Sequence, residues 1–569
     1  MNSMLIIVAV LNFLFTKIYA QNSQNSTIIF ETNSTKSISV RIRNSECDKC
    51  KAINYGQFNN FYINTISLDT FYPNYYFYFK SLATDEFICE SISQKEVSLN
   101  ENSVIKVQID YYNFKFNCYL TIVDNGKPNK YQPLIVVSSI LSFLYLCYFL
   151  TKLIFIKCKN RLADGSETDA DRIVINQDQE GILRGRQSSR SNRIKSIDVL
   201  RGMCLSIMIF VNFGAGGYSV LDHSVWNGLN LADTVFPIFI FLMGVSIPLS
   251  FKSIVRQNNF RLSIVIIKIV RRAMLLFFFG LVTSNSSDLK LSELRIMGVL
   301  QRFSISYFIM ALVELLNIKL NNYEYNFLLN NQKKFVEIFY YWIQWLVSSF
   351  LLFIWILITF LLPLDNCQSG YLGPGGLHEN GSHFNCTGGA AGYVDRKILG
   401  TSHMYQDPTC KFIYKNQIPF DPEGLLGCLT SCVLTYLGVM TGHIILHHDQ
   451  KQKIVLKFIF YGIIFGLIGL TLSKFSINDG WIPINKNLWS LSFILVMASI
   501  GLFSLSVLFI LVDILDWYSG TPFLYMGRNS IVIYIGHLVF GNYFPNFNFG
   551  YTHFLLLSNS IYWNKYRNF

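Results

Sequence analysis

Residues 235–251 read VFPIFIFLMGVSIPLSF, an apolar run without a charged side chain, and this run decides the class of fold. A helix that crosses a bilayer needs roughly 20 mainly apolar residues. Further runs of this kind lie at 134–156, 197–217, 264–282, 299–316, 339–364, 425–446, 455–472, 488–512 and 531–543. We therefore predict a polytopic α-helical membrane protein with about ten or eleven transmembrane helices. Residues 554–563 are short and polar, and we do not count them as a span.

The composition agrees with this class of protein. Hydrophobic residues make up 51% of the chain and charged residues only 14%, whereas soluble proteins carry about 25% charged residues. The net charge of +12 gathers at the ends of the apolar runs, which is typical of cytoplasmic loops rather than of a nucleic-acid-binding surface. We expect membrane lipid around the chain and no nucleic-acid partner.

The segment before the first span has the pattern of a small secreted domain. Residues 1–20 have the short apolar core and the small final residue of a signal peptide, with cleavage after Ala20. Residues 21–133 alternate apolar and polar side chains, which predicts a small lumenal β-sandwich. The even number of cysteines in a translocated segment suggests two disulfides, of which Cys47 with Cys50 and Cys89 with Cys118 is the simplest pairing. The segment has no histidine, and we expect no metal site there.

The rest of the chain follows the positive-inside rule. After the first transmembrane helix at 134–156 comes a polar, mixed-charge cytoplasmic linker at 157–195, and then a transmembrane domain at 196–569. A long glycine-rich loop at 365–423 is predicted to be lumenal and suited to a lid and to sugar contacts. Its cysteines are odd in number, so one pairs elsewhere or stays free: Cys367, Cys386 and Cys410. The Asn-X-Ser/Thr sequons all fall on the lumenal side, at Asn25, Asn33, Asn285, Asn380 and Asn385.

The main candidate for chemistry precedes the run at 235–251. Residues 222–233 read DHSVWNGLNLAD, which places His223 between Asp222 and Asp233 at the membrane edge. Imidazole can accept and donate protons, or carry an acyl group, near neutral pH. The segment therefore predicts group-transfer chemistry, with a structural histidine beside an interfacial Trp226 as the alternative.

Polar residues inside membrane helices are costly and are functional candidates by default. Asp198 and Arg201 lie three residues apart at a cytoplasmic helix entry, either as a site or as a helix-start ion pair. Asn212 lies roughly 22 Å along the same helix from Ile197, at the standard helical rise, and should therefore approach His223.

The last candidate functional residues are a group of cations and one polar stripe. Lys268, Arg271 and Arg272 could bind a polyphosphate, or they could extend to the cytoplasmic membrane surface. Arg302 lies deeper in its span and is expected to meet an anion, either a protein carboxylate or a ligand phosphate. Asn529, Tyr534 and His537 give the span at 531–543 a polar stripe, which is either part of a site or a hydrogen-bonded helix interface.

At these residues the chain resembles the heparan-α-glucosaminide N-acetyltransferase family of lysosomal membrane enzymes. The resemblance covers residues 196–545, in family order. The matching blocks are DVLRG (198–202), VNFG (211–214), residues 223–244, GVLQR (298–302), LGPGG (372–376), NCTGGAAGYVDR (385–396), DPEG (421–424), NKNLWSLS (485–492) and GH (536–537). As a set these blocks are highly specific for the family.

The resemblance implies an enzyme that transfers acetyl from cytosolic acetyl-CoA to the terminal glucosamine amine of heparan sulfate in the lysosomal lumen. It assigns catalysis to His223, as general base or acetyl carrier, and to Asn212. It implies a homodimer in the lysosomal membrane without a metal cofactor. The expected substrate- and cofactor-binding residues are Asp198, Arg201, Asp233, Lys268, Arg271, Arg272, Arg302, Asn487, Trp489, Asn529 and His537.

Two departures from the family pattern are visible. Asp222 stands before the histidine where the best-known members carry a basic residue, and the chain is short after Tyr543.

Two alternative functions remain open at this stage. One is a transporter or channel on an acyltransferase-like scaffold, and the other is an O-acetyltransferase that acts on glycan hydroxyls. The acceptor could also be another terminal amino sugar.

Overall fold

The computed structural model describes residues 25–32, 38–58, 64–69, 74–81, 87–89, 96–99, 103–112, 115–124, 193–213, 220–255, 262–285, 290–320, 341–365 and 367–540, with 139, 215 and 218. The predicted signal peptide, the final segment 554–563 and nearly all of the predicted first span and linker lie outside the described residues.

The amino-terminal region folds into two small sheets. Their strands are β1 (Asn25–Thr32), β2 (Ile38–Asn44), β3 (Ile53–Phe58), β4 (Asn64–Asp69), β5 (Asn74–Ser81), β6 (Phe87–Ile88), β7 (Glu96–Ser98), β8 (Val104–Tyr112) and β9 (Lys115–Asp124). One sheet has the order β4-β1-β8-β9, and the other has β3-β2-β5-β6 with β7 on β5. Within the first sheet, β1 and β8 run parallel.

The two sheets enclose one apolar core, as the alternation of the sequence predicts. Phe30 of β1 meets Phe79 of β5 with ring centroids 6.3 Å apart, across the gap between the sheets. The disulfide between Cys89 and Cys118 joins a residue after β6 to β9 and therefore ties the sheets together. The second predicted disulfide, between Cys47 and Cys50, is also present. The β-sandwich prediction is confirmed.

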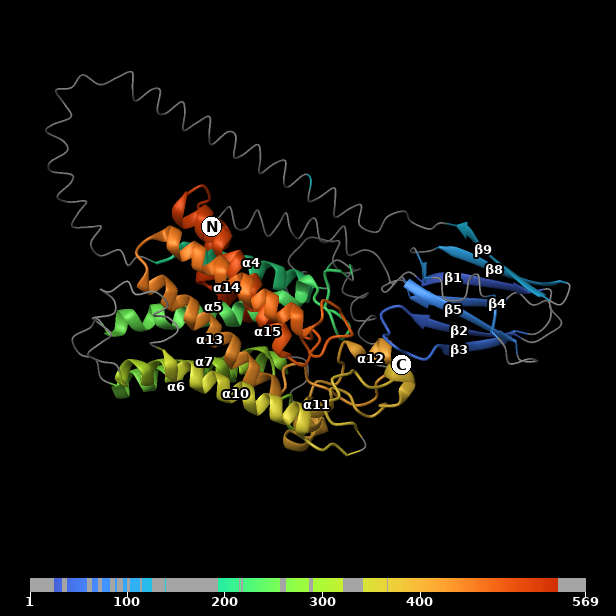
Figure 1. Ribbon diagram of the computed structural model, residues 1–569, viewed down its shortest axis with the longest axis horizontal. Coiled ribbons are helices and arrows are strands. Elements are labelled where there is room, and N and C mark those ends of the chain that lie inside the picture. Colours follow the sequence, from blue (N-terminus) through green and yellow to red (C-terminus); the bar gives the residue numbers. More distant parts are fainter. Residues whose placement is uncertain are drawn as a thin grey trace, which may run out of the picture.

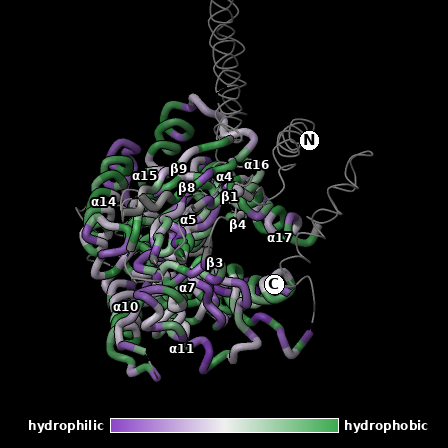
Figure 2. Tube along the Cα trace, turned by 90° about the vertical axis from the view of Figure 1, so that its right-hand side faces the viewer, coloured by the Kyte–Doolittle hydropathy of each residue, from purple (hydrophilic) through white to green (hydrophobic). Residues whose placement is uncertain are grey.

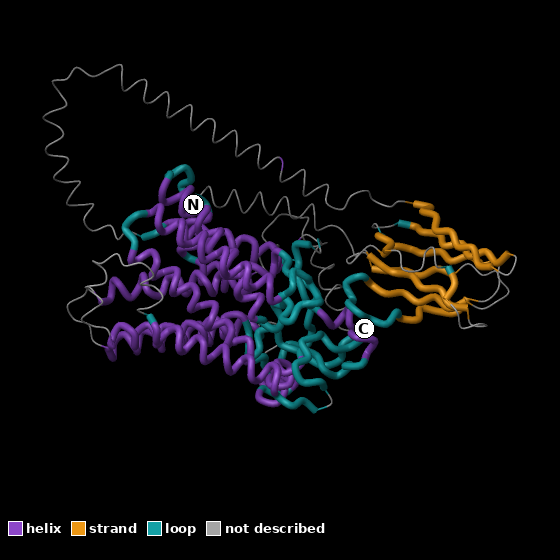
Figure 3. Tube along the Cα trace, viewed as in Figure 1, coloured by secondary structure: helices purple, strands orange, loops and turns teal. Residues whose placement is uncertain are grey.

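The carboxy-terminal region is a helical bundle (Figures 1 and 3). Its long helices are α4 (Lys195–Asn212), α5 (Leu231–Val255), α6 (Leu262–Ser284), α7 (Val299–Leu320), α10 (Trp342–Leu361), α13 (Leu425–His447), α14 (Lys451–Leu472) and α15 (Leu491–Leu508). The short helices are α11 (Gly389–Ile398), α12 (Cys410–Tyr414), α16 (Phe523–Arg528) and α17 (Ser530–Phe540). Single turns lie at η2 (Leu291–Glu293), η3 (His378–Gly381) and η4 (Thr401–His403), and a π-helical turn, η5 (Phe509–Ile514), extends α15.

Six of the described helices are long and apolar enough to cross a membrane by length and composition: α5, α7, α10, α13, α14 and α15 with its extension. The protein is therefore a multi-pass membrane protein, as predicted. Helices α4 and α6 occupy two further predicted spans but each carries three charged residues. Figure 2 shows hydrophobic residues along peripheral helices such as α10 and α17.

The centre of the bundle is the crossing of α5 and α13, where two glycines bring the backbones together. A Cβ atom on Gly244 would lie 2.1 Å from the carbonyl oxygen of Thr435. A Cβ atom on Gly438 would lie 2.2 Å from the carbonyl oxygen of Phe241. Neither distance can hold a real atom pair, so the crossing requires both glycines. The crossing keeps α5 in place, and the first turn of α5 carries Asp233.

The connecting loops collect at the end of the bundle that faces the β-sandwich (Figure 1). Asp48 donates its backbone N–H to the hydroxyl of Tyr414 at 3.2 Å. Lys49 forms an ion pair with Asp479 at 3.1 Å. The first contact holds the sandwich against α12, and the second holds it against the connection between α14 and α15.

Candidate functional site

His223 lies in the connection between α4 and α5, beside a buried carboxylate. Its Nδ1 atom is 2.8 Å from Oδ1 of Asp233. The side chain of Asp233 is 1% exposed, whereas that of His223 is 32% exposed, so the ring reaches solvent while its partner does not. The sequence analysis selected both residues, and the structure brings them together.

The start of α5 explains why Asp233 stays fixed. Its second oxygen, Oδ2, accepts backbone N–H groups from Asn230 at 3.1 Å and from Ser224 at 3.0 Å. The bond from Asn230 is half of a capping box, in which the third helical residue satisfies a free N–H group at the helix start. One carboxylate therefore caps the helix and orients the histidine ring.

Lys486 is a third member of this cluster that the sequence analysis did not select. Its Nζ atom is 2.9 Å from Nδ1 of His223, 3.4 Å from Nε2, and 3.5 Å from Oδ1 of Asp233. It lies 263 residues from His223 in the chain. The family block at 485–492 contains this lysine and could have identified it. From that block the sequence analysis selected Asn487 and Trp489, but not Lys486.

Three loops hold Lys486 in this position. Asn485 donates to the side-chain oxygen of Asn227 at 2.9 Å, and Asn487 donates to the carbonyl oxygen of Trp226 at 3.4 Å. The indole of Trp226 donates in turn to the carbonyl oxygen of Leu372 at 3.0 Å. Asn487 therefore positions the loop that carries Lys486.

A buried ion-pair network lies next to this cluster. Arg295 binds Asp421 and Glu423, with each closest nitrogen–oxygen distance at 2.7 Å. Burial alone would raise the pKa of Glu423, but the positive charges of Arg295, Lys486 and Arg302 hold that pKa below its usual value. Lys486 therefore acts on both His223 and Glu423. The sequence analysis selected neither Arg295 nor its acidic partners.

Arg302 is fully buried, as its depth in the predicted span suggested. Its guanidinium donates to the carbonyl oxygen of Gly424 at 2.8 Å and lies 4.7 Å from the ring centre of Trp489, and an anion bound to it stays a prediction. The Nε and Nη1 atoms have no hydrogen-bond partner among the described residues. An indole face stabilises a guanidinium, which explains why Trp489 is there.

Asp395 of α11 is a buried acid whose charge interacts with that of Arg302. It is 1% exposed; its Oδ1 atom accepts the N–H of Leu425 at 2.8 Å, and its Oδ2 atom has no partner in the part of the chain that the structure describes. Burial raises the pKa of Asp395 to about 7, although the charge of Arg302 opposes that rise. The carboxyl group therefore titrates in the physiological range.

Asn212 and His537 form a separate pair. The Nδ2 atom of Asn212 is 2.9 Å from Nε2 of His537, which links the end of α4 to α17. The sequence placed Asn212 near His223, but its hydrogen bond goes to His537. Asn529 donates to the carbonyl oxygen of Tyr525 at 3.2 Å and ends helix α16.

The remaining candidates gather around the opposite end of α4, where Asp198 lies roughly 21 Å from Asn212 at the standard helical rise. Asp198 pairs with Arg193 at 2.7 Å and with Arg201 at 3.1 Å, and Arg201 also donates to Ser246 at 2.9 Å. The guanidinium of Arg272 lies 4.6 Å from the ring centre of Tyr307, and three exposed cations share this part of α6: Lys268, Arg271 and Arg272.

The structure of the loop at 365–423 shows how its cysteines pair and whether its sequons are exposed. Cys367 pairs with Cys386, and Cys410 keeps a free, buried thiol that accepts a hydrogen bond from Asn416. Asn380 and Asn385 are exposed, which suits glycosylation.

The burial of Asn285 conflicts with its predicted glycosylation. Its side-chain amide is buried and donates to the carbonyl oxygens of Leu281 and Arg295, so a glycan on that nitrogen would break both bonds. Among the described residues, no group of three His, Cys, Asp or Glu side chains could hold a metal ion.

Fold and site together define a multi-pass membrane protein with an aspartate–histidine–lysine cluster where its bundle meets a small β-sandwich. Comparison with known proteins narrows this class. Residues 193–324 match a family model described as a domain of unknown function (DUF5009). The chain is 44% identical over 367 residues to heparan-alpha-glucosaminide N-acetyltransferase of Homo sapiens, covering 63% of this chain and 55% of the human protein.

The mouse protein gives a similar result. The chain is 41% identical over 386 residues to heparan-alpha-glucosaminide N-acetyltransferase of Mus musculus, covering 67% of this chain and 58% of the mouse protein. This chain is therefore a homologue of the heparan-alpha-glucosaminide N-acetyltransferases. It spans just over half the length of the curated relatives that it matches.

Proposed function

We propose that this protein is a transmembrane acetyltransferase that moves acetyl from cytosolic acetyl-CoA to the terminal glucosamine amine of heparan sulfate or of a similar amino sugar. The observation that carries the proposal is the 2.8 Å contact between the partly exposed ring of His223 and the buried carboxylate of Asp233. The activity that the names of the two relatives state supports the choice of acetyl donor and acceptor.

The chemistry requires a base beside the acceptor amine. The amine nitrogen attacks the thioester carbonyl carbon, a C–N bond forms, and the C–S bond breaks as the thiol leaves. With Nδ1 of His223 donating to Asp233, the lone pair of Nε2, which lies 3.4 Å from the ammonium group of Lys486, takes the proton that the amine loses. In the alternative relay, the same nitrogen first carries the acetyl group. We favour direct transfer, because one site can then hold both substrates.

Lys486 supplies the positive charge that this reaction needs. Attack on the thioester carbonyl places negative charge on its oxygen, and a fixed cation nearby stabilises that oxygen in the transition state. The ammonium group of Lys486 lies within 3.4 Å of both ring nitrogens of His223, and its side chain is only 12% exposed. Asp233 and Glu423 hold it there by charge.

The cations at the other end of α4 suit the phosphates of acetyl-CoA. Arg272, Lys268 and Arg271 are exposed, while Arg201 is held by Asp198 and Ser246. Phosphate groups bind such guanidinium and ammonium groups through charge-assisted hydrogen bonds. The donor then enters from the cytoplasm with its thioester directed along the bundle toward His223, which faces the lumen.

The oligomeric state and the cellular location belong to the same proposal. The protein works as a homodimer in the lysosomal membrane, with the β-sandwich and the loop at 365–423 in the lumen. Asp222, which departs from the family pattern, accepts the backbone N–H of His223 at 2.7 Å and therefore helps to fix the loop. Mass photometry of the purified protein in nanodiscs tests the dimer.

An acceptor panel tests the reaction. The full chain, purified in detergent, is given radiolabelled acetyl-CoA with either glucosamine or N-acetylglucosamine. We expect label on glucosamine alone, because only glucosamine offers a free amine. Label on both sugars would identify an O-acetyltransferase. Uptake of label into proteoliposomes without transfer to either sugar would identify a transporter.

A further inference from the structure

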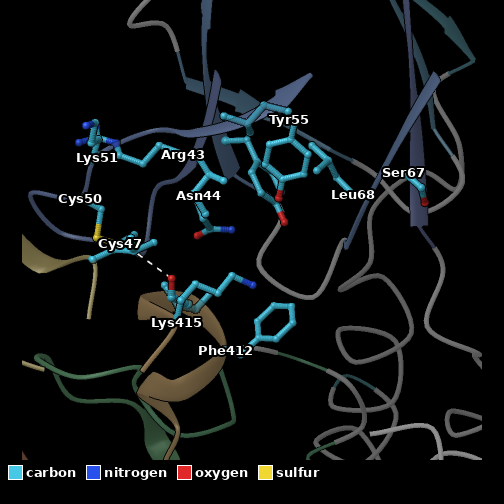
Figure 4. Close-up of a pocket in the computed structure, with 15 residues that line it drawn as sticks. Arg43, Asn44, Cys47, Cys50, Lys51, Tyr55, Ser67, Leu68, Phe412 and Lys415 are labelled. Carbon is cyan, nitrogen blue, oxygen red and sulfur yellow. Dashed lines mark hydrogen bonds between the residues drawn. A yellow bond between two sulfur atoms is a disulfide. The ribbon is translucent and has the colours of Figure 1, made fainter. Parts of the chain in front are cut away.

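A cavity lies where the β-sandwich meets the loop that carries α12 (Figure 4). Its volume is about 270 Å³. One wall comes from β2, β3 and the connection between them, and the opposite wall comes from α12 and its neighbours. The cavity is separate from the cluster at His223, and nothing in the proposed reaction uses it.

The lining is basic and aromatic. It contains Arg43, Lys51 and Lys415, and none of its described lining residues is an aspartate or a glutamate. The aromatic members are Tyr55, Tyr75 and Phe412. A ligand in this cavity therefore meets cations and ring faces together.

Two of the cations lie against aromatic rings. The Nε atom of Arg43 is buried without a hydrogen-bond partner among the described residues, while its guanidinium lies 4.8 Å from the ring centre of Tyr76. The Nζ atom of Lys415 lies 4.7 Å from the ring centre of Phe412, on an exposed side chain. The carboxylate of nearby Asp48 is engaged by His378, and this hydrogen bond keeps the pKa of Asp48 below its usual value.

The walls are fixed rather than loose. The disulfide between Cys47 and Cys50 closes the turn that forms one side. The carbonyl oxygen of Lys49, within that turn, accepts the N–H of Asn380 at 3.1 Å. A preformed cavity loses little entropy when a ligand enters, so its affinity is not spent on ordering the protein.

This chemistry matches an anionic sugar unit. Sulfate and carboxylate groups bind arginine and lysine through charge-assisted hydrogen bonds, and the apolar face of a sugar ring packs on aromatic side chains. The volume is small for a drug-like ligand and suits one or two sugar rings.

The cavity is linked to the candidate active site by packing. Cys47, Cys50 and Ile413 line it, and they belong to the same apolar cluster as Val225 and Trp226. Those two residues follow His223 by two and three positions in the chain. The cavity wall and the segment that follows His223 therefore pack on one apolar cluster, which holds them in a fixed relation.

We infer that this cavity binds an internal, sulfated or carboxylated unit of the acceptor chain, while the terminal amino sugar reaches His223. The inference rests on the proposed function for the identity of the acceptor. It adds a recognition site that selects long anionic acceptors over the free sugar.

The test measures binding without acetyl transfer. The full chain in detergent is titrated by calorimetry with a sulfated glucosamine-containing hexasaccharide whose terminal amine is already acetylated. The variant is Lys51→Gln/Lys415→Gln, since both side chains are exposed and neither substitution disturbs the fold. The control is Lys397→Gln/Lys411→Gln, which removes the same charge from exposed positions on α11 and α12 outside the cavity.

We expect the variant to weaken binding about tenfold or more, as for the loss of charge-assisted hydrogen bonds, and the control to bind as the wild type does. The desulfated hexasaccharide should bind weakly to all three proteins. Equal binding by variant and wild type would overturn the inference, as would polyglutamate binding as tightly as the sulfated sugar. Kinetics separate this from the proposed function: in an active chain the variant raises KM for the sulfated acceptor and leaves KM for glucosamine unchanged.

Discussion

At the scale of single residues, Asp233 connects the fold to the chemistry. The same carboxylate caps helix α5 through Asn230, receives the N–H of Ser224 and holds the ring of His223. A carboxylate with these three bonds cannot move without breaking the helix start. The geometry of His223 is therefore set before any substrate arrives.

Replacing this carboxylate by an amide tests that role. Asp233→Asn keeps the size of the side chain but allows its nitrogen to donate to Nδ1 of His223, which puts the ring proton on the catalytic nitrogen. We expect kcat to fall about 10²- to 10⁴-fold, the usual contribution of a positioned general base. The matched control is Asp222→Asn, which leaves the ring contact intact and should stay within a few-fold of wild type. Equal losses in both variants would contradict the role.

Asp395 makes stability depend on pH. Its pKa is raised to about 7 by burial, so the folded protein holds a proton there that the unfolded chain has already lost above pH 4. This contribution is complete at low pH and is lost as the pH rises toward 7. We expect the Tm of wild type to fall between pH 5 and pH 7.5 by more than the Tm of Asp395→Asn, measured by thermal unfolding in detergent. Parallel curves for the two proteins would exclude this role.

Sequence reasoning found the residues that lie close together in the chain. His223 and Asp233 are ten positions apart, within one stretch before an apolar run. Lys486 is 263 positions from His223, and His537 is 325 positions from Asn212. No spacing rule connects such pairs, because tertiary packing alone brings their loops together. The same limit applies to Arg302 and Trp489, whose ring contact joins two residues that are far apart in the chain.

At the scale of helices, the crossing of α5 and α13 decides how tightly the bundle closes. Apolar runs predicted where these helices lie, since a membrane span is defined by length and composition. The runs did not predict which helices touch, because the length and the composition of a run do not specify its neighbours. Gly244 and Gly438 decide this contact, because a side chain at either position would overlap the backbone of the other helix.

Gly244→Ala therefore forces the two helices apart. The new methyl group would overlap the carbonyl oxygen of Thr435, and overpacking of this kind costs about 1–3 kcal/mol of unfolding free energy. The control is Gly536→Ala in α17, where nothing lies within 4 Å of the new atom. Alanine there should stabilise by about 0.5–1 kcal/mol, its advantage over glycine in a helix. Thermal unfolding measures both, and a lower Tm for the control than for Gly244→Ala would contradict the packing.

A second helix contact lies at the predicted cytoplasmic end of the bundle and was not selected from the sequence. Glu314 of α7 is fully buried and binds both Gln344 of α10 and, at 3.2 Å, His443 of α13. Buried charges are retained only when they are paired. A single glutamate within an apolar run gave no indication of its partners.

At the scale of the whole molecule, the β-sandwich is part of the site region rather than a separate appendage. The turn at 44–51 docks on α12, and the chain from α12 leads back to the loops around His223. The sequence predicted the sandwich and its two disulfides from alternation and cysteine count. It could not predict the docking, which depends on pairs more than 360 positions apart.

Tyr414→Phe should loosen this docking. The hydroxyl of Tyr414 accepts the N–H of Asp48 and donates to the carbonyl oxygen of Glu46, so its loss leaves both groups unpaired at a cost of about 1–3 kcal/mol. Hydrogen exchange at the Asp48 amide should accelerate about tenfold or more, with little change in the helices. Tyr393→Phe, which removes an exposed hydroxyl bonded to Asp365, is the control and should leave Asp48 unaffected. Unchanged exchange at Asp48 would show that other contacts hold the turn.

The central claim is that His223 performs the transfer of acetyl from acetyl-CoA to an amino sugar. The most direct measurement is transfer of labelled acetyl to glucosamine by purified wild type and by His223→Ala, with acetyl-CoA binding measured on both. The account predicts transfer by wild type, a loss of about 10²-fold or more in the variant, and an unchanged Kd for acetyl-CoA. Transfer that survives in a variant with normal acetyl-CoA binding would contradict the assignment of His223.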